Sequence, residues 1–395
     1  MSASTVRAPR VAFYSHDTMG LGHMRRNLLL AGELAELTPH PSTLLITGTR
    51  EISRFTLPRG VDLLSLPALY KDASAQYHAR TLNVALDDII ALRSAIIQGA
   101  VESFAPDVFI VDNVPRGALG ELEPTLRMLR RGGRTRCVLG LRDILDDPTH
   151  VRAEWNRAGN VATIRQYYDA VWVYGDESVL DVAREYDLPA DVRRRMHYTG
   201  YLDQRRRAPA RGAAPGAATH DVVCLLGGGQ DGLPLARAFL QANFPAPWEP
   251  LLVTGPMMSV AARTEVARLS ALAPDKRIVE FVDDPAALMR DARAVITMGG
   301  YNTVCDVLSH GVRALVVPRV VPRTEQLIRA SRLAERGLLD MLHPDALSPE
   351  ALCRWVCAPP DRRPQRPVRL HEGPAIGALV RDLIPAGTSE VRHAS

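Results

Sequence analysis

Lysine, cysteine and aromatic residues are all scarce in this sequence of 395 residues. Lys71 and Lys276 are its only lysines, so nearly all of its basic charge is carried by arginine. The 5 cysteines are scattered and form no C-x-x-C pair, which argues against a disulfide framework. We therefore expect a protein of a reducing compartment, the cytoplasm.

Long apolar runs are also absent. No run approaches the roughly 18 residues that cross a bilayer, and the opening MSASTVRAPR contains no apolar stretch typical of a secretory signal. Short arginine clusters at 130–131, 193–195 and 205–207 are not interleaved with aromatic residues, so nucleic acid is not an expected partner. Such clusters are typical of a solvated surface, and peripheral contact with acidic lipid head groups is the alternative.

The chain is rich in short, apolar segments that are each followed by a helical pattern. Most are continuously apolar, which is typical of strands buried on both faces of a parallel sheet with crossover helices. In the first half they lie at 11–16, 42–48, 61–67, 107–112, 136–142, 170–175 and 196–200, and the clearest helical stretches at 84–104 and 119–130. In the second half they lie at 221–229, 250–255, 277–283, 294–300 and 313–319.

Residues 204–220, rich in Arg, Ala, Pro and Gly, interrupt this alternation and predict a linker. The sequence thus predicts the α/β fold class, with two doubly wound, Rossmann-like domains at 1–203 and 221–372. Residues 373–395 predict a C-terminal helix that packs back on the body, followed by a frayed tail. Ligands of such folds bind beyond the carboxyl ends of the strands, and in two domains those ends can face each other across a cleft.

The first glycine-rich turn follows the strand at 11–16 and contains Gly20, Gly22 and His23. Glycines there permit positive φ or close approach of a ligand, and the free N–H groups of the next helix attract anions. A dinucleotide fingerprint is excluded because Arg25 replaces its third glycine and the second strand lacks the acidic residue that holds an NAD ribose. His23 either acts on a substrate or packs as a structural histidine, and we favour the first.

A second turn, LLGGGQDGL at 225–233, carries three consecutive glycines that can cradle phosphate with backbone N–H groups. In a third, a strand ends at Gly299–Gly300, before a helix that Asn302 and Thr303 can cap. Asp306 lies further along that helix, where it either accepts hydrogen bonds from ribose hydroxyls or stabilises the first helical turn.

Taken in order, these elements resemble the GT-B glycosyltransferases and most closely family 28, typified by the peptidoglycan N-acetylglucosaminyltransferase. That family has a glycine-rich loop ending in Gly-His, which GLGH at 20–23 matches. Its Gly-Gly-Ser-x-Gly diphosphate loop is similar to GGGQDG at 227–232, and its Gly-x-x-Thr-x-x-Glu segment to GYNTVCD at 300–306. Its Gln-containing helix start is similar to RTEQ at 323–326.

The resemblance implies a UDP-sugar donor on the C-terminal domain and an acceptor on the N-terminal domain. The donor-binding residues that it implies are Gly227, Gly228, Gly229 and Gln230 for the diphosphate, Phe281 for the uracil, Gly300, Asn302 and Thr303 near the α-phosphate, Asp306 for the ribose, and Glu325 and Gln326 for the sugar. His23 would be the catalytic base or orient the acceptor, and Asp17 and Asp112 are the alternative bases.

Three residues depart from the family pattern. Gly229 replaces a serine, which removes one phosphate hydrogen bond, and Asp306 is one methylene shorter than the family's glutamate. Asp231 stands where a glycine is usual, and a carboxylate there would have to turn away to cap the helix.

We therefore expect a glycosyltransferase that acts with inversion, with the UDP-sugar as co-substrate and no other cofactor. No Asp-x-Asp motif follows an N-terminal strand, so we expect no obligatory metal. The alternatives are a UDP-sugar hydrolase, whose loop GLGHMRR also resembles, and a non-catalytic nucleotide-sugar-binding partner subunit. The acceptor, a lipid carrier, a polysaccharide or a small natural product, is expected near a polar loop at 70–81 and the strand ends at 112–117 and 140–147.

Overall fold

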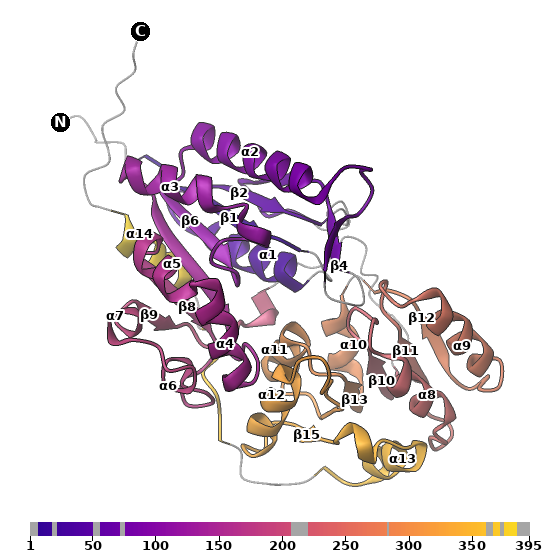
Figure 1. The fold of residues 1–395 in the computed structure, drawn as a ribbon. Coiled ribbons are helices and arrows are strands. Elements are labelled where there is room, and N and C mark those ends of the chain that lie inside the picture. Colours follow the sequence, from indigo (N-terminus) through magenta and orange to yellow (C-terminus); the bar gives the residue numbers. More distant parts are fainter. Residues whose placement is uncertain are drawn as a thin grey trace.

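The computed structural model describes residues 7–17, 22–49, 56–71, 76–206, 220–282, 284–360, 366–371 and 375–384. They form two α/β domains, each built on its own parallel sheet (Figure 1). The predicted fold class is therefore confirmed.

The N-terminal domain contains a seven-stranded sheet in the order β3-β2-β1-β6-β7-β8-β9, in which all neighbours are parallel. Its strands are β1 (Arg10–Ser15), β2 (Ser42–Thr47), β3 (Val61–Ser65), β6 (Val108–Asp112), β7 (Arg136–Arg142), β8 (Ala170–Tyr174) and β9 (Met196–Tyr198). All the apolar segments predicted here are strands. Every residue of β6 and β8 is buried, which is why these strands read as continuous apolar runs.

The C-terminal domain contains a six-stranded parallel sheet in the order β12-β11-β10-β13-β14-β15. Its strands are β10 (Val222–Leu225), β11 (Pro250–Val253), β12 (Arg277–Val279), β13 (Ala294–Thr297), β14 (Ala314–Val316) and β15 (Asp340–Met341). The predicted segments account for all but β15, an edge strand of two residues that is too short to carry an apolar pattern.

Helices pack on both faces of the N-terminal sheet. Phe13 belongs to one apolar core together with Met24 of α1, and its neighbour Tyr14 belongs to a second core with Ile97 of α2. The α-helices of the first domain are α1 (Gly22–Leu34), α2 (Leu86–Phe104), α3 (Glu123–Gly132), α4 (Pro148–Ala158), α5 (Asn160–Tyr167), α6 (Val182–Glu185) and α7 (Ala190–Arg193). The later ones are α8 (Leu233–Gln241), α9 (Val260–Ser270), α10 (Pro285–Asp291), α11 (Tyr301–His310), α12 (Glu325–Ala334), α13 (Pro349–Cys357) and α14 (Ala375–Leu383). None of these helices is long and apolar enough to cross a membrane.

The prediction of a polar loop at 70–81 is wrong in part. Strands β4 (Leu69–Lys71) and β5 (Tyr77–Ala79) pair antiparallel, with the rings of Tyr70 and His78 stacked 5.3 Å apart. Cross-strand ring pairs of this kind stabilise a hairpin that polar composition alone does not reveal. Residues 72–75 lie outside the described residues.

The chain crosses between the domains twice. The first crossing begins after the short helix η3 (Gln204–Arg206), which the sequence analysis assigned to the linker. This helix is held in place by a hydrogen bond that the Gln204 N–H donates to Ser309 Oγ (2.9 Å). The rest of the predicted linker, 207–219, lies outside the described residues. On the return, Leu370 pairs with Tyr201 of the N-terminal domain, slightly before the boundary predicted at 372.

Helix α14 then packs on α1, where the absence of a side chain at Gly377 leaves room for Leu37. This is the packing predicted for the C-terminal helix, and Figure 1 shows α14 in yellow beside the N-terminal domain. The predicted frayed tail, from 385 on, lies outside the described residues.

One apolar core continues across the junction between the domains. It includes Met24, Tyr201 and Val304, and the rings of Tyr201 and Tyr301 stack with their centroids 6.4 Å apart. The carboxyl ends of the two sheets therefore meet over a packed interface.

Candidate functional site

Both sheets reverse their strand order at a point where a glycine-rich turn follows a central strand. In the N-terminal sheet this switch point lies between β1, which precedes His23, and β6, which ends at Asp112. In the C-terminal sheet it lies between β10, which precedes Gly227, and β13, which precedes Gly299. Ligands of open parallel sheets bind at such switch points, so the predicted site residues gather where the fold offers binding sites.

His23 and Asp112 meet at the N-terminal switch point. His23 Nδ1 lies 2.8 Å from Asp112 Oδ2, and Arg26 Nη2 lies 2.6 Å from both Asp112 carboxylate oxygens. Burial alone would raise the pKa of Asp112, but Arg26 and His23 hold it well below its usual range. His23 Nδ1 also lies 3.0 Å from Arg26 Nη2. An ionised Asp112 favours the tautomer that carries the proton on Nδ1, in which Nε2 has the free lone pair.

The exposure of this triad suits a base that meets a substrate. The His23 side chain is 16% exposed, whereas Asp112 is 1% and Arg26 is 2% exposed. The Arg26 guanidinium also lies over the rings of Tyr174 (5.6 Å) and Tyr301 (5.4 Å), which fix its position. His23 can therefore reach solvent while the two charges behind it stay rigid.

Asp17 occupies a different environment. Its φ of 41° is in the left-handed region, and Oδ2 accepts hydrogen bonds from the hydroxyls of Ser15 and Thr47 (2.5 Å for Thr47). The residue is 4% exposed, and these bonds fix the end of β1. Of the alternative bases, only Asp112 contacts His23.

The second glycine turn is shaped by two residues with positive φ, Gly227 (63°) and Gly229 (92°). Gly229 is buried, and a Cβ atom there would collide with the backbone oxygen of Thr254. The serine that the family has at this position would not fit this loop. Gly228 and Gln230 are exposed, and nothing lies near the position of a Cβ on Gly228, so the loop presents open backbone to a ligand.

Asp231 does not cap helix α8, which corrects the sequence expectation. The N-cap of α8 is Gly232, without a side-chain cap. Asp231 instead pairs with Arg319, whose Nη1 lies 3.1 Å from Oδ2. The carboxylate at the glycine loop is thus balanced by a cation that follows the carboxyl end of β14, two strands away in the sheet.

Helix α11 begins at Tyr301 with Gly300 as its N-cap, so neither Asn302 nor Thr303 caps it, contrary to the sequence expectation. Asn302 Nδ2 instead donates to the backbone oxygen of Gly22 (2.9 Å), across the junction. The start of α11 therefore abuts the turn that carries His23. Asp306, on the same helix, is 3% exposed.

Two of the remaining predicted donor residues, Glu325 and Gln326, contact Arg319. Glu325 opens α12 as predicted, is 4% exposed, and accepts from Arg319 Nη2 through Oε1 (2.5 Å). Gln326 Oε1 accepts the backbone N–H of Arg319 (3.0 Å), and Phe281 follows β12, partly exposed. The helix start is therefore held by Arg319, a residue that sequence reasoning did not single out.

A buried ion pair joins the domains beside these residues. Arg329 Nε and Nη2 donate to the two oxygens of Asp143 (2.8 and 2.7 Å), and both side chains are at most 3% exposed. Burial lowers the pKa of Arg329, but Asp143 raises it above its usual value. Thr324 N–H adds a bond to Asp146 Oδ1 (2.7 Å), so α12 is anchored to the N-terminal domain.

Sequence reasoning also missed Arg26 and Asp143. Arg26 follows His23 by three positions on a helix, a spacing that places both on one face. Asp143 directly follows the carboxyl end of β7, where functional residues of parallel sheets concentrate. Spacing and strand ends could have pointed to both, but their partners on other elements could not be read from the chain.

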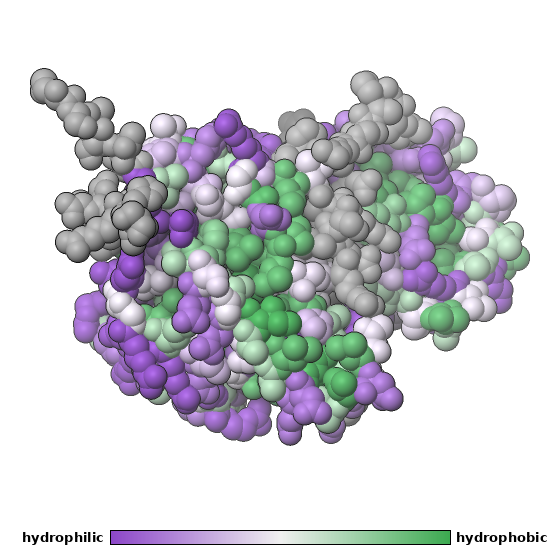
Figure 2. Space-filling view, turned by 90° about the horizontal axis from the view of Figure 1, so that it is seen from above, coloured by the Kyte–Doolittle hydropathy of each residue, from purple (hydrophilic) through white to green (hydrophobic). Residues whose placement is uncertain are grey.

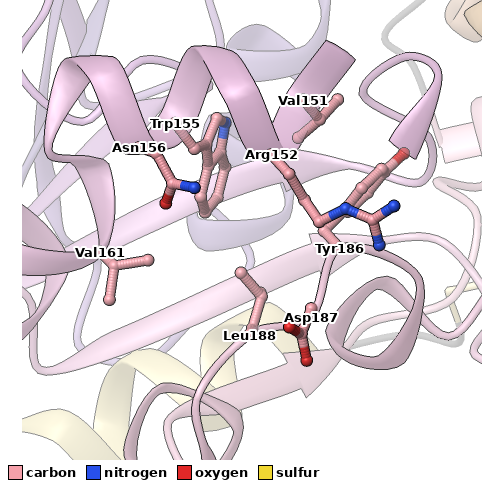
Figure 3. Close-up of a pocket in the computed structure, with 8 residues that line it drawn as sticks. All are labelled: Val151, Arg152, Trp155, Asn156, Val161, Tyr186, Asp187 and Leu188. Carbon is pink, nitrogen blue, oxygen red and sulfur yellow. The ribbon is translucent and has the colours of Figure 1, made fainter. Parts of the chain in front are cut away.

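The pocket in Figure 3 lies elsewhere, on the N-terminal domain. It is lined by Val151, Arg152, Trp155, Asn156, Val161, Tyr186, Asp187 and Leu188. Its volume of about 90 Å³ is far below the roughly 300–1,000 Å³ of small-molecule sites. It contains none of the predicted site residues.

Comparison with known proteins supports the resemblance to family 28. Residues 222–356 match the family model described as glycosyltransferase family 28 C-terminal domain. A curated relative from Burkholderia cenocepacia (strain HI2424), UDP-N-acetylglucosamine--N-acetylmuramyl-(pentapeptide) pyrophosphoryl-undecaprenol N-acetylglucosamine transferase, is 35% identical over 99 residues. That match spans 25% of this chain and 27% of the relative. The C-terminal domain is therefore family 28-like, as its motifs indicate.

Solved structures share the fold over nearly the whole chain. TcCGT1 in complex with UDP aligns with a TM-score of 0.60 at 13% identity, over 97% of both chains. Acinetobacter baumannii MurG aligns with a TM-score of 0.54 at 16% identity, over 95% of this chain and 99% of the other. At these identities the likeness shows the fold alone, which is GT-B.

Proposed function

We propose that this chain is a glycosyltransferase that moves a sugar from a UDP-sugar to a hydroxyl acceptor with inversion. The observation that carries the proposal is the contact between Asn302 and Gly22, which brings the start of α11 against the turn of His23. A base on one domain and a glycine-rich, family 28-like nucleotide-sugar site on the other thus adjoin. The relative from Burkholderia is named as a transferase of N-acetylglucosamine from UDP-N-acetylglucosamine, which supports a UDP-sugar donor.

In the proposed reaction, His23 Nε2 accepts the proton of the acceptor hydroxyl, and Asp112 stabilises the imidazolium that forms. The hydroxyl oxygen bonds to the anomeric carbon as the bond from that carbon to the UDP oxygen breaks. The electron pair of that bond stays on UDP. Backbone N–H groups of the 227–229 loop and the N-terminus of α11 would stabilise the charge on the diphosphate.

The decisive experiment measures UDP release from a panel of UDP-sugars, with and without candidate acceptors. Release that depends on both a donor and an acceptor supports the transferase. Release of equal rate without any acceptor indicates a UDP-sugar hydrolase, and UDP-sugar binding without turnover indicates a non-catalytic partner subunit.

We propose that the reaction needs no metal ion, since loop N–H groups and helix dipoles can carry the diphosphate charge. The same assay run with excess EDTA is expected to keep at least half of its rate. A rate that disappears with EDTA and returns with Mg²⁺ or Mn²⁺ would contradict this.

A lipid-linked acceptor and peripheral membrane contact fit one surface of the N-terminal domain. Tyr70, Leu82, Val84 and Leu92, near the β4–β5 hairpin and on α2, are each at least 40% exposed. Figure 2 shows hydrophobic residues gathered across the middle of the face seen from above. The name of the Burkholderia relative includes an undecaprenol-linked acceptor, and we propose an acceptor of that class, which a lipid-linked member of the acceptor panel would test.

A further inference from the structure

Arg142 is the last residue of β7 and lies at the junction between the domains. Successive residues of a strand face opposite sides, so Arg142 is on the side of Val138, whose core also contains Met24 of α1. Arg142 therefore lies on the α1 side of the sheet, at its carboxyl edge. The proposed base, His23, is on that same helix.

Three other arginines at or near the junction are each held in an ion pair. The pairs are Arg26 with Asp112, Arg329 with Asp143, and Arg319 with Glu325. Arg142 itself makes no hydrogen bond or ion pair with any residue that the structure describes, and its Nε is buried without a partner. The residue as a whole remains partly exposed, so a ligand can reach the guanidinium.

The guanidinium of Arg142 is protonated at neutral pH. Burial lowers the pKa of its guanidinium to about 10, with Arg26 as the next cause, which still leaves the group protonated. Glu325 and Asp112 attract the guanidinium through space, but neither forms a hydrogen bond or an ion pair with it, and Glu325 Oε2 also lies buried without a partner. A guanidinium whose Nε is buried without a partner is unfavourable, and a bound anion would supply the missing hydrogen bond.

We propose that Arg142 anchors an anion-binding subsite at the junction, which takes a phosphate or carboxylate group of a substrate. The planar guanidinium suits both groups, because its N–H donors match two oxygens at once. The subsite lies within the electrostatic influence of Arg26, Asp112 and Glu325. This proposal rests on the proposed function, because that function identifies the substrates. The anion belongs either to the donor diphosphate or to an acidic acceptor or sugar.

The test compares the wild-type protein with Arg142→Gln and Arg142→Lys, and with Arg127→Gln as a control on the exposed face of α3. Calorimetry measures binding of UDP, uridine and inorganic pyrophosphate, and then of glucuronate and inorganic phosphate to the UDP-saturated protein. Thermal denaturation with and without pyrophosphate confirms that each variant is folded.

If the anion is the donor diphosphate, Arg142→Gln weakens UDP and pyrophosphate binding at least ten-fold and leaves uridine binding unchanged. If it belongs to another substrate, UDP binding is unchanged while phosphate or glucuronate binding to the UDP-bound protein weakens at least ten-fold. In either case Arg142→Lys gives an intermediate loss and Arg127→Gln gives none.

Equal binding of all five probes by wild type and a folded Arg142→Gln would overturn the subsite. A different result would refute the proposed function but not the subsite. A protein that binds no UDP but loses pyrophosphate binding in Arg142→Gln would refute the transferase and keep the subsite.

Discussion

The triad of His23, Asp112 and Arg26 assigns one task to each side chain. Arg26 keeps Asp112 ionised, and Asp112 fixes the tautomer of His23, whose side chain is the most exposed of the three. A buried histidine can also pair with a buried carboxylate, as His371 does with Glu33, but the side chain of His23 is the more exposed of the two histidines. This difference supports the proposal that His23 acts.

Replacing His23 by Asn removes the proton acceptor but keeps a polar side chain. We expect turnover to fall about a hundred-fold or more, because general base catalysis is lost, while UDP affinity stays within about two-fold. Steady-state kinetics and UDP calorimetry check this. Normal turnover of the variant would move the role of base to Asp112 or Asp17.

Asp306 tests the donor side at the same scale. We expect Asp306→Ala to weaken UDP binding by about 1.5–3 kcal/mol, or roughly ten- to a hundred-fold, if its carboxylate binds the ribose hydroxyls. Calorimetry measures the affinity, and circular dichroism confirms the fold. Unchanged UDP affinity would remove Asp306 from the site and leave it as a buried helix residue.

At the scale of elements, the loop after β10 contains one glycine that the backbone conformation requires and one that it does not. Gly229 has a positive φ and no room for a Cβ, whereas Gly228 has neither restriction. We expect Gly229→Ala to lower the free energy of unfolding by about 1–3 kcal/mol and Gly228→Ala to change it by about 0.5 kcal/mol or less. Urea denaturation compares the two, and equal losses would contradict this account of the loop.

Central strands such as β6 and β8 could be predicted from the sequence because they are buried on both faces and so are continuously apolar. The β4–β5 hairpin could not, since its strands are only three residues long and the small core that Leu69 shares with Ile89 of α2 joins residues that lie apart in the sequence. The residues at strand ends, His23, Asp112 and the glycines, could be predicted for a related reason: turns between a strand and a helix have their own residue types.

The cations of the site could not be predicted in the same way. The chain contains many arginines, and nothing in the sequence distinguishes Arg142, Arg319 and Arg329 from the others. Arg319 and Arg329 pair with carboxylates on elements far away in the chain, whereas Arg142 has no such partner. Likewise Asp231 could not be assigned, because its partner Arg319 is 88 residues distant. Sequence motifs predict the backbone of this site better than its charges.

At the scale of the molecule, the Arg329–Asp143 pair braces the two domains. We expect Asp143→Asn to lower the free energy of unfolding by about 3–5 kcal/mol, because it leaves Arg329 buried without a full counter-charge. Asp191→Asn, in the exposed pair with Arg165, is the control and should cost about 1 kcal/mol or less. Urea denaturation measures both, and equal effects would show that the buried pair does not hold the junction.

The paired crossings have a consequence for how this architecture can be altered. The chain leaves the N-terminal domain just after Tyr201 and returns beside it at Leu370, where the backbone groups of Tyr201 bond to Arg369 and His371. The C-terminal domain is thus an insertion whose entry and exit are neighbours, and both ends of the described chain belong to the host domain. We expect that a C-terminal domain from another protein of this fold can be grafted between these two points, and the N-terminal domain then keeps its own N- and C-terminal elements.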